Sequence, residues 1–250
     1  MNEIYKTEGI IIGKRNFFEA DQILTIFTRD YGKIQVKAKG LKRSLAKMAG
    51  HLEIFNYSKI DLVKGKNFFI VTGAETIDSF SDLREDFTKV SILYYFSEIL
   101  VKILEEDIRH KNTFNFFLSI LENLRAGDID EEILMIYFEL GILSHLGFKP
   151  DLLSCVGCRD EISGHKFYFS QEKGGILCET CGGSDFFSSD LSFNAVKLIR
   201  IIISKDLDFI KKIRLEKSLI GEVKNISRFF LEHILGRELK SKKFLDSLNI

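Results

Sequence analysis

The sequence is poor in several residue types, and these shortages exclude several classes of protein. Its 250 residues include one proline, no tryptophan and only four cysteines. Such a composition contains no proline-rich linker, and four cysteines are too few for a disulfide-dense secreted scaffold. The first ten residues, MNEIYKTEGI, lack a basic segment followed by an apolar one. We therefore expect no export signal and a cytoplasmic protein.

Long apolar runs and catalytic motifs are also missing. The apolar runs extend over only a few residues, whereas a transmembrane helix needs about 20, so we expect no membrane contact. The chain contains no G-x-x-x-x-G-K-[ST], G-x-G-x-x-G, H-E-x-x-H or G-x-S-x-G motif. These absences predict that the protein is not an enzyme and has no small-molecule substrate.

The formal net charge is zero, but the charges are unevenly distributed. Lysine plus arginine and aspartate plus glutamate each number 36. Residues 1–80 contain 13 basic and 9 acidic side chains, and the remainder contains 23 and 27. A basic segment joined to an acidic body indicates a polyanionic partner for the first part.

Residues 1–80 have the composition of β-strands, being rich in Ile, Val, Phe, Thr and Tyr and interrupted by glycine-containing turns. The predicted strands span residues 4–14, 22–29, 33–39, 51–63 and 67–77. Five short strands in about 80 residues predict a small barrel such as an OB-fold. The pattern alone also allows an SH3-like barrel.

The strand predicted at residues 33–39 alternates strictly between polar and apolar residues. The period of two places its lysines on one face and its Ile, Val and Ala residues on the barrel side. The connection that follows adds three basic residues, and no acidic residue occurs between residues 32 and 52. Positive side chains along a groove bind phosphate backbones. The predicted DNA-binding residues are Lys33, Lys37, Lys39, Lys42, Arg43 and Lys47.

Two interpretations of this strand remain open. It is either part of a nucleic-acid interface or a solvated edge strand protected by its lysines. Aromatic side chains that face outward would favour the first, because bases stack on them. The candidates are Phe17, Phe18, Tyr31 and Phe55.

From residue 82 the apolar period changes from two to about 3.6, which indicates helices. We predict a helix that starts near residue 82, where Asp82 and Glu85 resemble a capping box. Further helices are predicted at residues 112–125, 130–146, 193–204 and 216–235, with a short strand at 166–170. The predicted domains are an OB-fold (1–80), two helical parts (81–150 and 187–250) and a cysteine loop (151–186).

The four cysteines fall in two C-x-x-C pairs, separated by nineteen residues. They are Cys155, Cys158, Cys178 and Cys181. This spacing is typical of a tetrahedral zinc site with four thiolates, and four thiolates leave no open position for catalysis. We therefore predict one structural zinc per chain, in a zinc finger inserted into the helical domain. The alternatives are two disulfides, which need an oxidising compartment, or four inert core thiols.

Several stretches resemble the bacterial RecO family of recombination mediators. They read EADQILTIFTRDYGKI (19–34), VKAKG (36–40), LGFKPDLLSC (146–155), GGILC (174–178) and GRELKS (236–241). They occur in the family's order and cover nearly the whole chain. The resemblance implies an α+β protein with an N-terminal five-stranded OB-fold barrel, an α-helical domain and, in many members, a zinc finger.

The resemblance also implies a function in DNA repair and homologous recombination, near the nucleoid. It implies binding to single- and double-stranded DNA and annealing of strands. The implied partners are RecR and the C-terminal tail of single-stranded-DNA-binding protein, in loading recombinase onto coated DNA. One departure is the loop after Gly40, which is less basic than in the family and lacks its proline. A zinc-stabilised OB-fold protein that binds RNA and a protein-binding adaptor remain alternatives.

Overall fold

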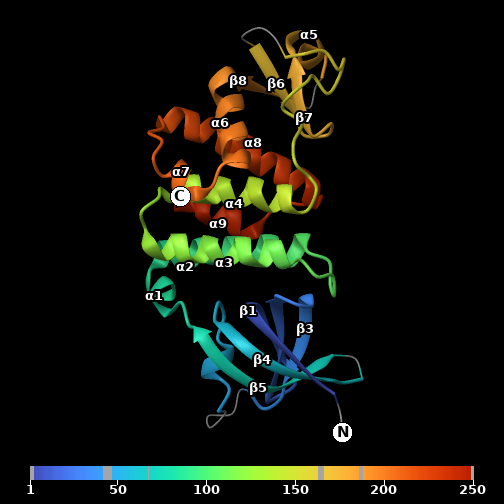
Figure 1. Cartoon of the computed structure of the whole chain (residues 1–250), viewed down its shortest axis with the longest axis vertical. Helices are drawn as coiled ribbons and strands as arrows, with labels where there is room; N and C mark the ends of the chain where they lie inside the picture. Colours follow the sequence, from blue (N-terminus) through green and yellow to red (C-terminus); the bar gives the residue numbers. More distant parts are fainter. Residues whose placement is uncertain (1–2, 42–46, 67, 163–165, 186–187, 249–250) are drawn as a thin grey trace. The chain divides into compact units, whose positions relative to one another are not determined.

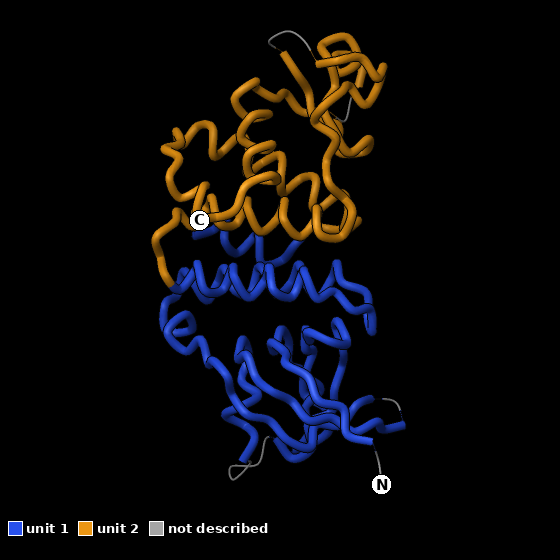
Figure 2. Tube along the Cα trace, in the orientation of Figure 1, with its two compact units in different colours: residues 1–125, 239–250 blue, residues 126–238 orange. Residues whose placement is uncertain are grey.

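The computed structural model describes residues 3–41, 47–66, 68–162, 166–185 and 188–248. The chain divides into two compact units (Figure 2): unit 1 comprises residues 1–125 and 239–250, and unit 2 comprises residues 126–238. These two units are defined by contacts between residues. The predicted domain boundaries were drawn from changes in sequence pattern, and they stay a prediction. Among the described residues, no helix combines the length and the apolar composition that a membrane span requires.

Unit 1 begins with a closed five-stranded barrel (Figure 1). Its strands follow the order β1-β2-β3-β5-β4, and β4 pairs back to β1. The contact between β3 and β5 is parallel, and the other contacts are antiparallel. This topology confirms the predicted OB-fold and excludes the SH3-like alternative. The strands are β1 (Ile4–Phe17), β2 (Asp21–Thr28), β3 (Gly32–Ala38), β4 (Tyr57–Lys64) and β5 (Phe69–Asp78).

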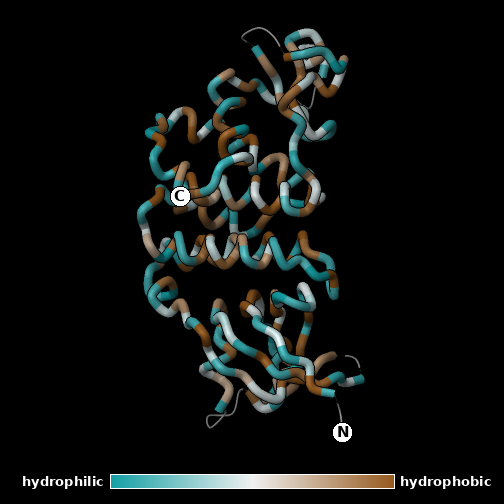
Figure 3. The backbone as a smooth tube through the Cα atoms, in the orientation of Figure 1, coloured by the Kyte–Doolittle hydropathy of each residue, from teal (hydrophilic) through white to brown (hydrophobic). Residues whose placement is uncertain are grey.

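The barrel forms because every strand supplies alternate apolar residues to one interior. The alternation is visible along the strands in Figure 3. In β3, the side chains of Ile34, Val36 and Ala38 are all buried in this core. Leu24 and Ile26 from β2 and Ile60 and Leu62 from β4 join them there. Each such side chain contributes roughly 1.5–3 kcal/mol on full burial, so the interior fixes the strand register.

The predicted strand at 51–63 is wrong in its first half. A 3-10 turn, η1 (Gly50–Leu52), occupies that part, and β4 begins only at Tyr57. Leu52 and Phe55 are buried, and Phe55 has a positive φ of 69°. The apolar residues that suggested a strand therefore belong to a turn. This turn lies against the barrel, because the side chain of Leu52 packs into the barrel core.

Four helices complete unit 1: α1 (Ser81–Glu85), α2 (Phe87–Ile103), α3 (Lys111–Ala126) and α9 (Lys240–Ser247). The predicted capping box at Asp82 is wrong, because Asp82 lies within α1. The carboxylate of Asp86 instead caps α2 by accepting from the amides of Thr88 and Lys89. The helix predicted at 112–125 is confirmed as α3, and Gly127 follows it with a φ of 66°, which favours glycine.

Unit 2 contains a helical part and a small antiparallel sheet of order β7-β6-β8. The predicted helices are confirmed, and Asp130 caps α4 by accepting from the amides of Glu132 and Ile133. The sequence analysis missed β7, β8, α5 and α7, which are only four or five residues long. The elements are α4 (Glu131–His145), β6 (Lys166–Ser170), β7 (Gly175–Cys178), α5 (Glu179–Gly183), β8 (Ser188–Ser192), α6 (Phe193–Ser204), α7 (Leu207–Ile210) and α8 (Lys217–Leu235).

One carboxylate attaches the C-terminal helix α9 to α2. Glu98 of α2 accepts hydrogen bonds from the backbone amides of Lys240 and Ser241, at 3.1 and 2.8 Å, and from the Ser241 hydroxyl. The ammonium of Lys102 donates to the same carboxylate at 2.6 Å. Partial burial by itself raises the pKa of Glu98, but these hydrogen bonds outweigh it and lower the pKa to about 2. The ionised carboxylate therefore serves as the cap that α9 lacks in its own sequence.

Replacing this carboxylate should loosen α9. We expect Glu98→Ala to destabilise the docked helix by about 1–2 kcal/mol, the range of a lost N-cap. Because the folded pKa is lowered, the stabilisation is complete above pH ~4.5 and is lost as the pH falls toward 2. Hydrogen exchange of the α9 amides at pH 7 measures the effect. The control is Glu85→Ala, an exposed position on α1, and equal α9 protection in both variants would contradict the assignment.

Candidate metal centre and nucleic-acid interface

The four cysteines come together at one edge of unit 2. Cys155 and Cys158 lie in the turn that follows α4 and its connection, Cys178 ends β7, and Cys181 lies in α5. One sulfur atom from each falls within 4.8 Å of all the others. Two segments that are nineteen residues apart therefore converge on one point.

The sulfur spacing matches a metal site and does not match disulfides. The sulfur atoms of Cys158 and Cys178 are 3.9 Å apart. Four sulfurs about 2.3 Å from a central metal in a tetrahedron are roughly 3.8 Å from one another. A disulfide bond is about 2.05 Å long, and all four cysteines are free. The arrangement therefore has the spacing that a four-thiolate metal site requires.

Backbone contacts hold the first cysteine turn against β7. The amide of Val156 donates to the carbonyl of Ile176 at 2.9 Å, and the amide of Cys178 donates to the sulfur of Cys155 at 3.4 Å. A Cβ atom at Gly157 would lie 3.0 Å from the sulfur of Cys181. A larger residue at position 157 would therefore require the Cys181 side chain or the turn to shift by a few tenths of an ångström.

The protonation of the thiols fits a bound cation. Burial raises the pKa of Cys155, but hydrogen bonds from nearby backbone amides, led by that of Cys178, outweigh it and bring the pKa to about 6. The thiol of Cys181 has a raised pKa because Cys178 and Cys155 lie beside it. One thiolate thus forms readily, and its negative charge disfavours ionisation of the neighbouring thiols. Four thiolates at this spacing would therefore require a positive ion among them.

The predicted DNA-binding face begins at the open side of β3, but its first lysine is covered. Lys33 is 7% exposed, and its ammonium donates to the carbonyl of Val101 in α2 at 2.7 Å. The segment after α2 runs beside β3, where Gln35 donates to Glu106 at 2.6 Å. Lys33 is therefore buried under α2 in this structure, and its predicted contact with DNA stays a prediction. Sequence alternation put Lys33 on the right face but did not show which end of that face α2 covers.

Toward the other end of β3 the face opens. Lys37 is 22% exposed at its side chain, and Lys39 and Lys47 are exposed. Lys42 and Arg43 lie outside the described residues. Among the described residues, the open end of β3 thus retains Lys37 and Lys39, and Lys47 is exposed farther along the connection to η1.

Lys37 has a defined set of neighbours. Its ammonium lies 2.8 Å from the carboxylate of Asp21, and 5.0 and 5.5 Å from the ring centroids of Phe17 and Phe18. Asp21 also accepts from the amide of Gly40 at 2.8 Å. The hydrogen bond from Lys37, followed by the one from Gly40, lowers the pKa of Asp21. Asp21 was not expected here, because the acid-free run in the sequence starts beyond it.

Of the four aromatic candidates, Phe18 faces solvent most clearly, at 76% exposure. Phe17 and Tyr31 are half-buried, and Phe55 is buried beside Tyr94.

Sequence reasoning also missed Lys64 and Lys66 at the turn between β4 and β5. Both are exposed, and they line a hollow together with Gln35, Phe68 and the acidic residues Glu106 and Asp107. The loops between strands 1 and 2 and strands 4 and 5 flank the binding face of an OB-fold. That topological rule, applied to the predicted strands, would have found these two lysines.

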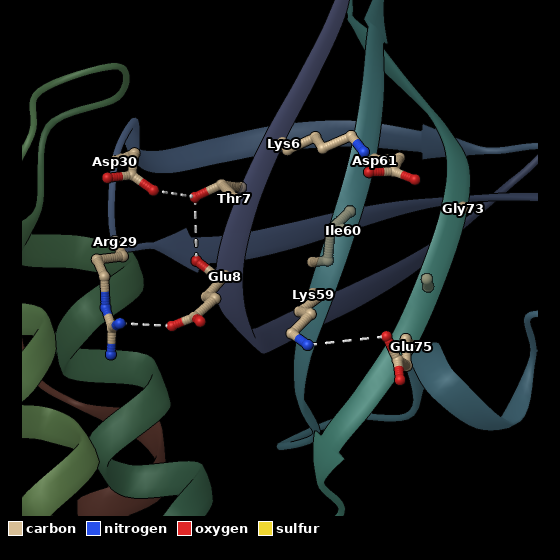
Figure 4. A pocket seen from close by; sticks show the side chains of 11 residues that line it. Lys6, Thr7, Glu8, Arg29, Asp30, Lys59, Ile60, Asp61, Gly73 and Glu75 are labelled. Atoms are coloured by element: carbon tan, nitrogen blue, oxygen red, sulfur yellow. Dashed lines mark hydrogen bonds and ion pairs between the residues drawn. The ribbon is translucent and has the colours of Figure 1, made fainter.

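A second hollow of the barrel has a different electrostatic character (Figure 4). Its side chains come from β1, β4 and β5 and from the end of β2. Basic and acidic groups pair across it, including Arg29 with Glu8 at 2.6 Å and Lys59 with Glu75 at 3.9 Å. Because the charges largely cancel, this hollow does not favour a polyanion.

The chain matches known proteins along almost its whole length. The family model described as Recombination protein O N terminal matches residues 1–80, and the model described as Recombination protein O C terminal matches residues 84–243. A DNA repair protein RecO from Roseiflexus sp. strain RS-1 is 34% identical over 247 residues, which cover 99% of this chain and 87% of that protein.

Other relatives agree. A DNA repair protein RecO from Dehalococcoides mccartyi strain 195 is 34% identical and covers 98% of this chain and 96% of its own length. One from Alkaliphilus metalliredigens strain QYMF is 32% identical and covers 92% and 94%. With both halves matched by the family models and relatives above 30% identity over nearly the full length, the chain belongs to the RecO family.

Proposed function

We propose that the protein is a mediator of DNA repair and homologous recombination. It binds single- and double-stranded DNA at the open end of the β3 face and anneals complementary strands. With RecR, it helps to load recombinase onto DNA coated by single-stranded-DNA-binding protein, whose C-terminal tail it also binds. The observation that carries this proposal is the match of both halves of the chain to the RecO family.

The geometry of the barrel supports the DNA-binding part of the proposal. Lys37 and Lys39 lie at the open end of an OB-fold face, and Lys64 and Lys66 lie at the turn between β4 and β5. Lys47 is exposed in the connection that leads to η1. Phosphates attract such a group of cations mainly through the release of condensed counterions, which is independent of sequence. The face therefore suits a protein that must act on any damaged site.

Annealing follows from the same electrostatics and needs no catalytic step. Two complementary strands repel each other through their phosphates, and cations that neutralise both allow them to approach. The chain has no P-loop, so the work comes from binding alone. We accordingly propose that the protein is not an enzyme.

We further propose that the four cysteines hold one structural zinc ion. Cys155, Cys158, Cys178 and Cys181 supply four thiolates, the donor set that zinc takes in closed tetrahedral sites. Bound zinc would supply charge compensation and a fixed fold for the cysteine segments. The residues themselves supply the backbone contacts that orient the sulfurs.

Replacing one cysteine should release the metal and unfold the cysteine segments, but it should not weaken DNA binding. We expect elemental analysis to find one zinc per purified chain and less than half of that in Cys178→Ser. Because the barrel belongs to the other unit, affinity for single-stranded DNA should change less than about twofold. Thr180→Ser, a conservative change between the same two cysteines, is the control and should keep its zinc. A zinc-free wild-type protein would refute the proposal.

Charge reversal at β3 should weaken DNA binding in a salt-dependent manner. Each phosphate contact removed by Lys37→Glu plus Lys39→Glu should make the negative slope of log K against log salt shallower by roughly 0.7 for a single strand. The matched control is Lys6→Glu plus Lys59→Glu, which makes the same charge change at the hollow of Figure 4. Equal losses in the two double variants would show only a net-charge effect and contradict the site.

Annealing should proceed without nucleotide. On complementary strands coated with single-stranded-DNA-binding protein, we expect the protein to speed annealing at low salt, and less so at high salt. Reversing Lys37, Lys39, Lys42 and Arg43 to glutamate should abolish the effect. A fluorescence-transfer assay, with and without ATP, measures the rate. A requirement for ATP, or full activity of the fourfold variant, would count against this mechanism.

A further inference from the structure

The turn between β1 and β2 presents an aromatic ring to solvent in an uncommon backbone conformation. β1 ends at Phe17, which pairs with Asp21 at the start of β2, so residues 18–20 form the turn. Phe18 has a φ of 54° and is 76% exposed. A positive φ is uncommon for a bulky residue, and this side chain lies outside the buried core of the barrel.

The surroundings of this ring suit a nucleobase. Phe17 meets it edge to face, with centroids 4.4 Å apart, and Phe68 from the turn between β4 and β5 lies 6.4 Å from Phe17. The ammonium of Lys37 lies 5.5 Å from the Phe18 centroid. The aromatic group thus joins the two turns that flank an OB-fold binding face, next to a cation.

We propose that the ring of Phe18 stacks on an unpaired base of single-stranded DNA, and that this contact distinguishes single strands from duplex. The inference deepens the proposed DNA-binding function and rests on it. A base presents its flat face to an aromatic ring only when it is not stacked in a duplex, whereas phosphates are accessible in both forms.

The charges around the turn indicate where the base and the phosphate backbone of a bound strand would lie. Glu19 and Asp21 flank the hollow beside Phe18 and disfavour a phosphate there. Lys37 lies close to the ring, and exposed Lys39 follows it along the same strand face. A strand whose backbone follows the lysines therefore places a base, and not a phosphate, over Phe18.

Removing the ring separates stacking from charge. We expect Phe18→Ala to weaken binding of an oligo-dT strand roughly tenfold, the loss typical of one base–aromatic stack. The salt slope should stay unchanged, because no phosphate contact is removed. Affinity for a dT·dA duplex of the same length should stay within about twofold of wild type.

A tryptophan reporter tests the contact directly, since the chain has no tryptophan of its own. In Phe18→Trp, oligo-dT should quench the new fluorescence and the duplex should not. The matched control is Phe209→Trp, because Phe209 is also exposed, at 44%, and has the ammonium of Lys205 at 5.5 Å from its ring. Its fluorescence should not respond to oligo-dT.

The outcomes separate this inference from the function on which it rests. Wild-type affinity and a normal salt slope in Phe18→Ala, or equal quenching of Phe18→Trp by strand and duplex, would overturn the stacking contact alone. Equal quenching of Phe18→Trp and Phe209→Trp by oligo-dT would overturn that contact as well. Failure of the unsubstituted protein to bind either form of DNA would overturn both proposals.

Discussion

The closed barrel imposes the constraint on which the DNA-binding face depends. Its interior accepts every second side chain of a strand and excludes water from it. In β3 the apolar residues Ile34, Val36 and Ala38 take the interior positions, so the lysines between and beyond them must lie outside. A register shift of one residue would bury charges, and this cost keeps the basic face in place.

Packing then decides which cations on that face are available. Helix α2 and the segment after it cover the beginning of β3, where Lys33 is hydrogen-bonded to Val101. The far end stays open, but Asp21 partly neutralises Lys37 there. The ion pair and the two phenylalanine rings hold this lysine in one orientation, whereas Lys39 is exposed. The face therefore combines one lysine held by its neighbours, Lys37, with a solvent-exposed lysine, Lys39.

The stability of the small sheet beside the cysteines depends on a different physical constraint. The strands β6, β7 and β8 are four or five residues long and form a sheet of only three strands. Such a sheet buries little apolar surface, and small structures of this kind commonly depend on a metal or on cross-links. Four sulfurs within 4.8 Å of one another bring both cysteine turns and the end of β7 to one point, where a metal ion could cross-link them. The packing of the adjoining helices relies on apolar side chains instead.

The local elements were largely determined by the sequence. Strict alternation predicted β3, the 3.6-residue period predicted α3, α4 and α6, and the C-x-x-C spacing predicted the cysteine cluster, because these signals act between residues close along the chain. The turn that replaces the predicted strand before Tyr57, the covering of Lys33 and the pairing of Lys37 with Asp21 were decided only by the tertiary structure. Each depends on a contact between distant segments: Leu52 with the barrel core, β3 with α2, and β3 with the turn before β2. Periodicity shows which face a residue occupies, but only packing shows what covers that face.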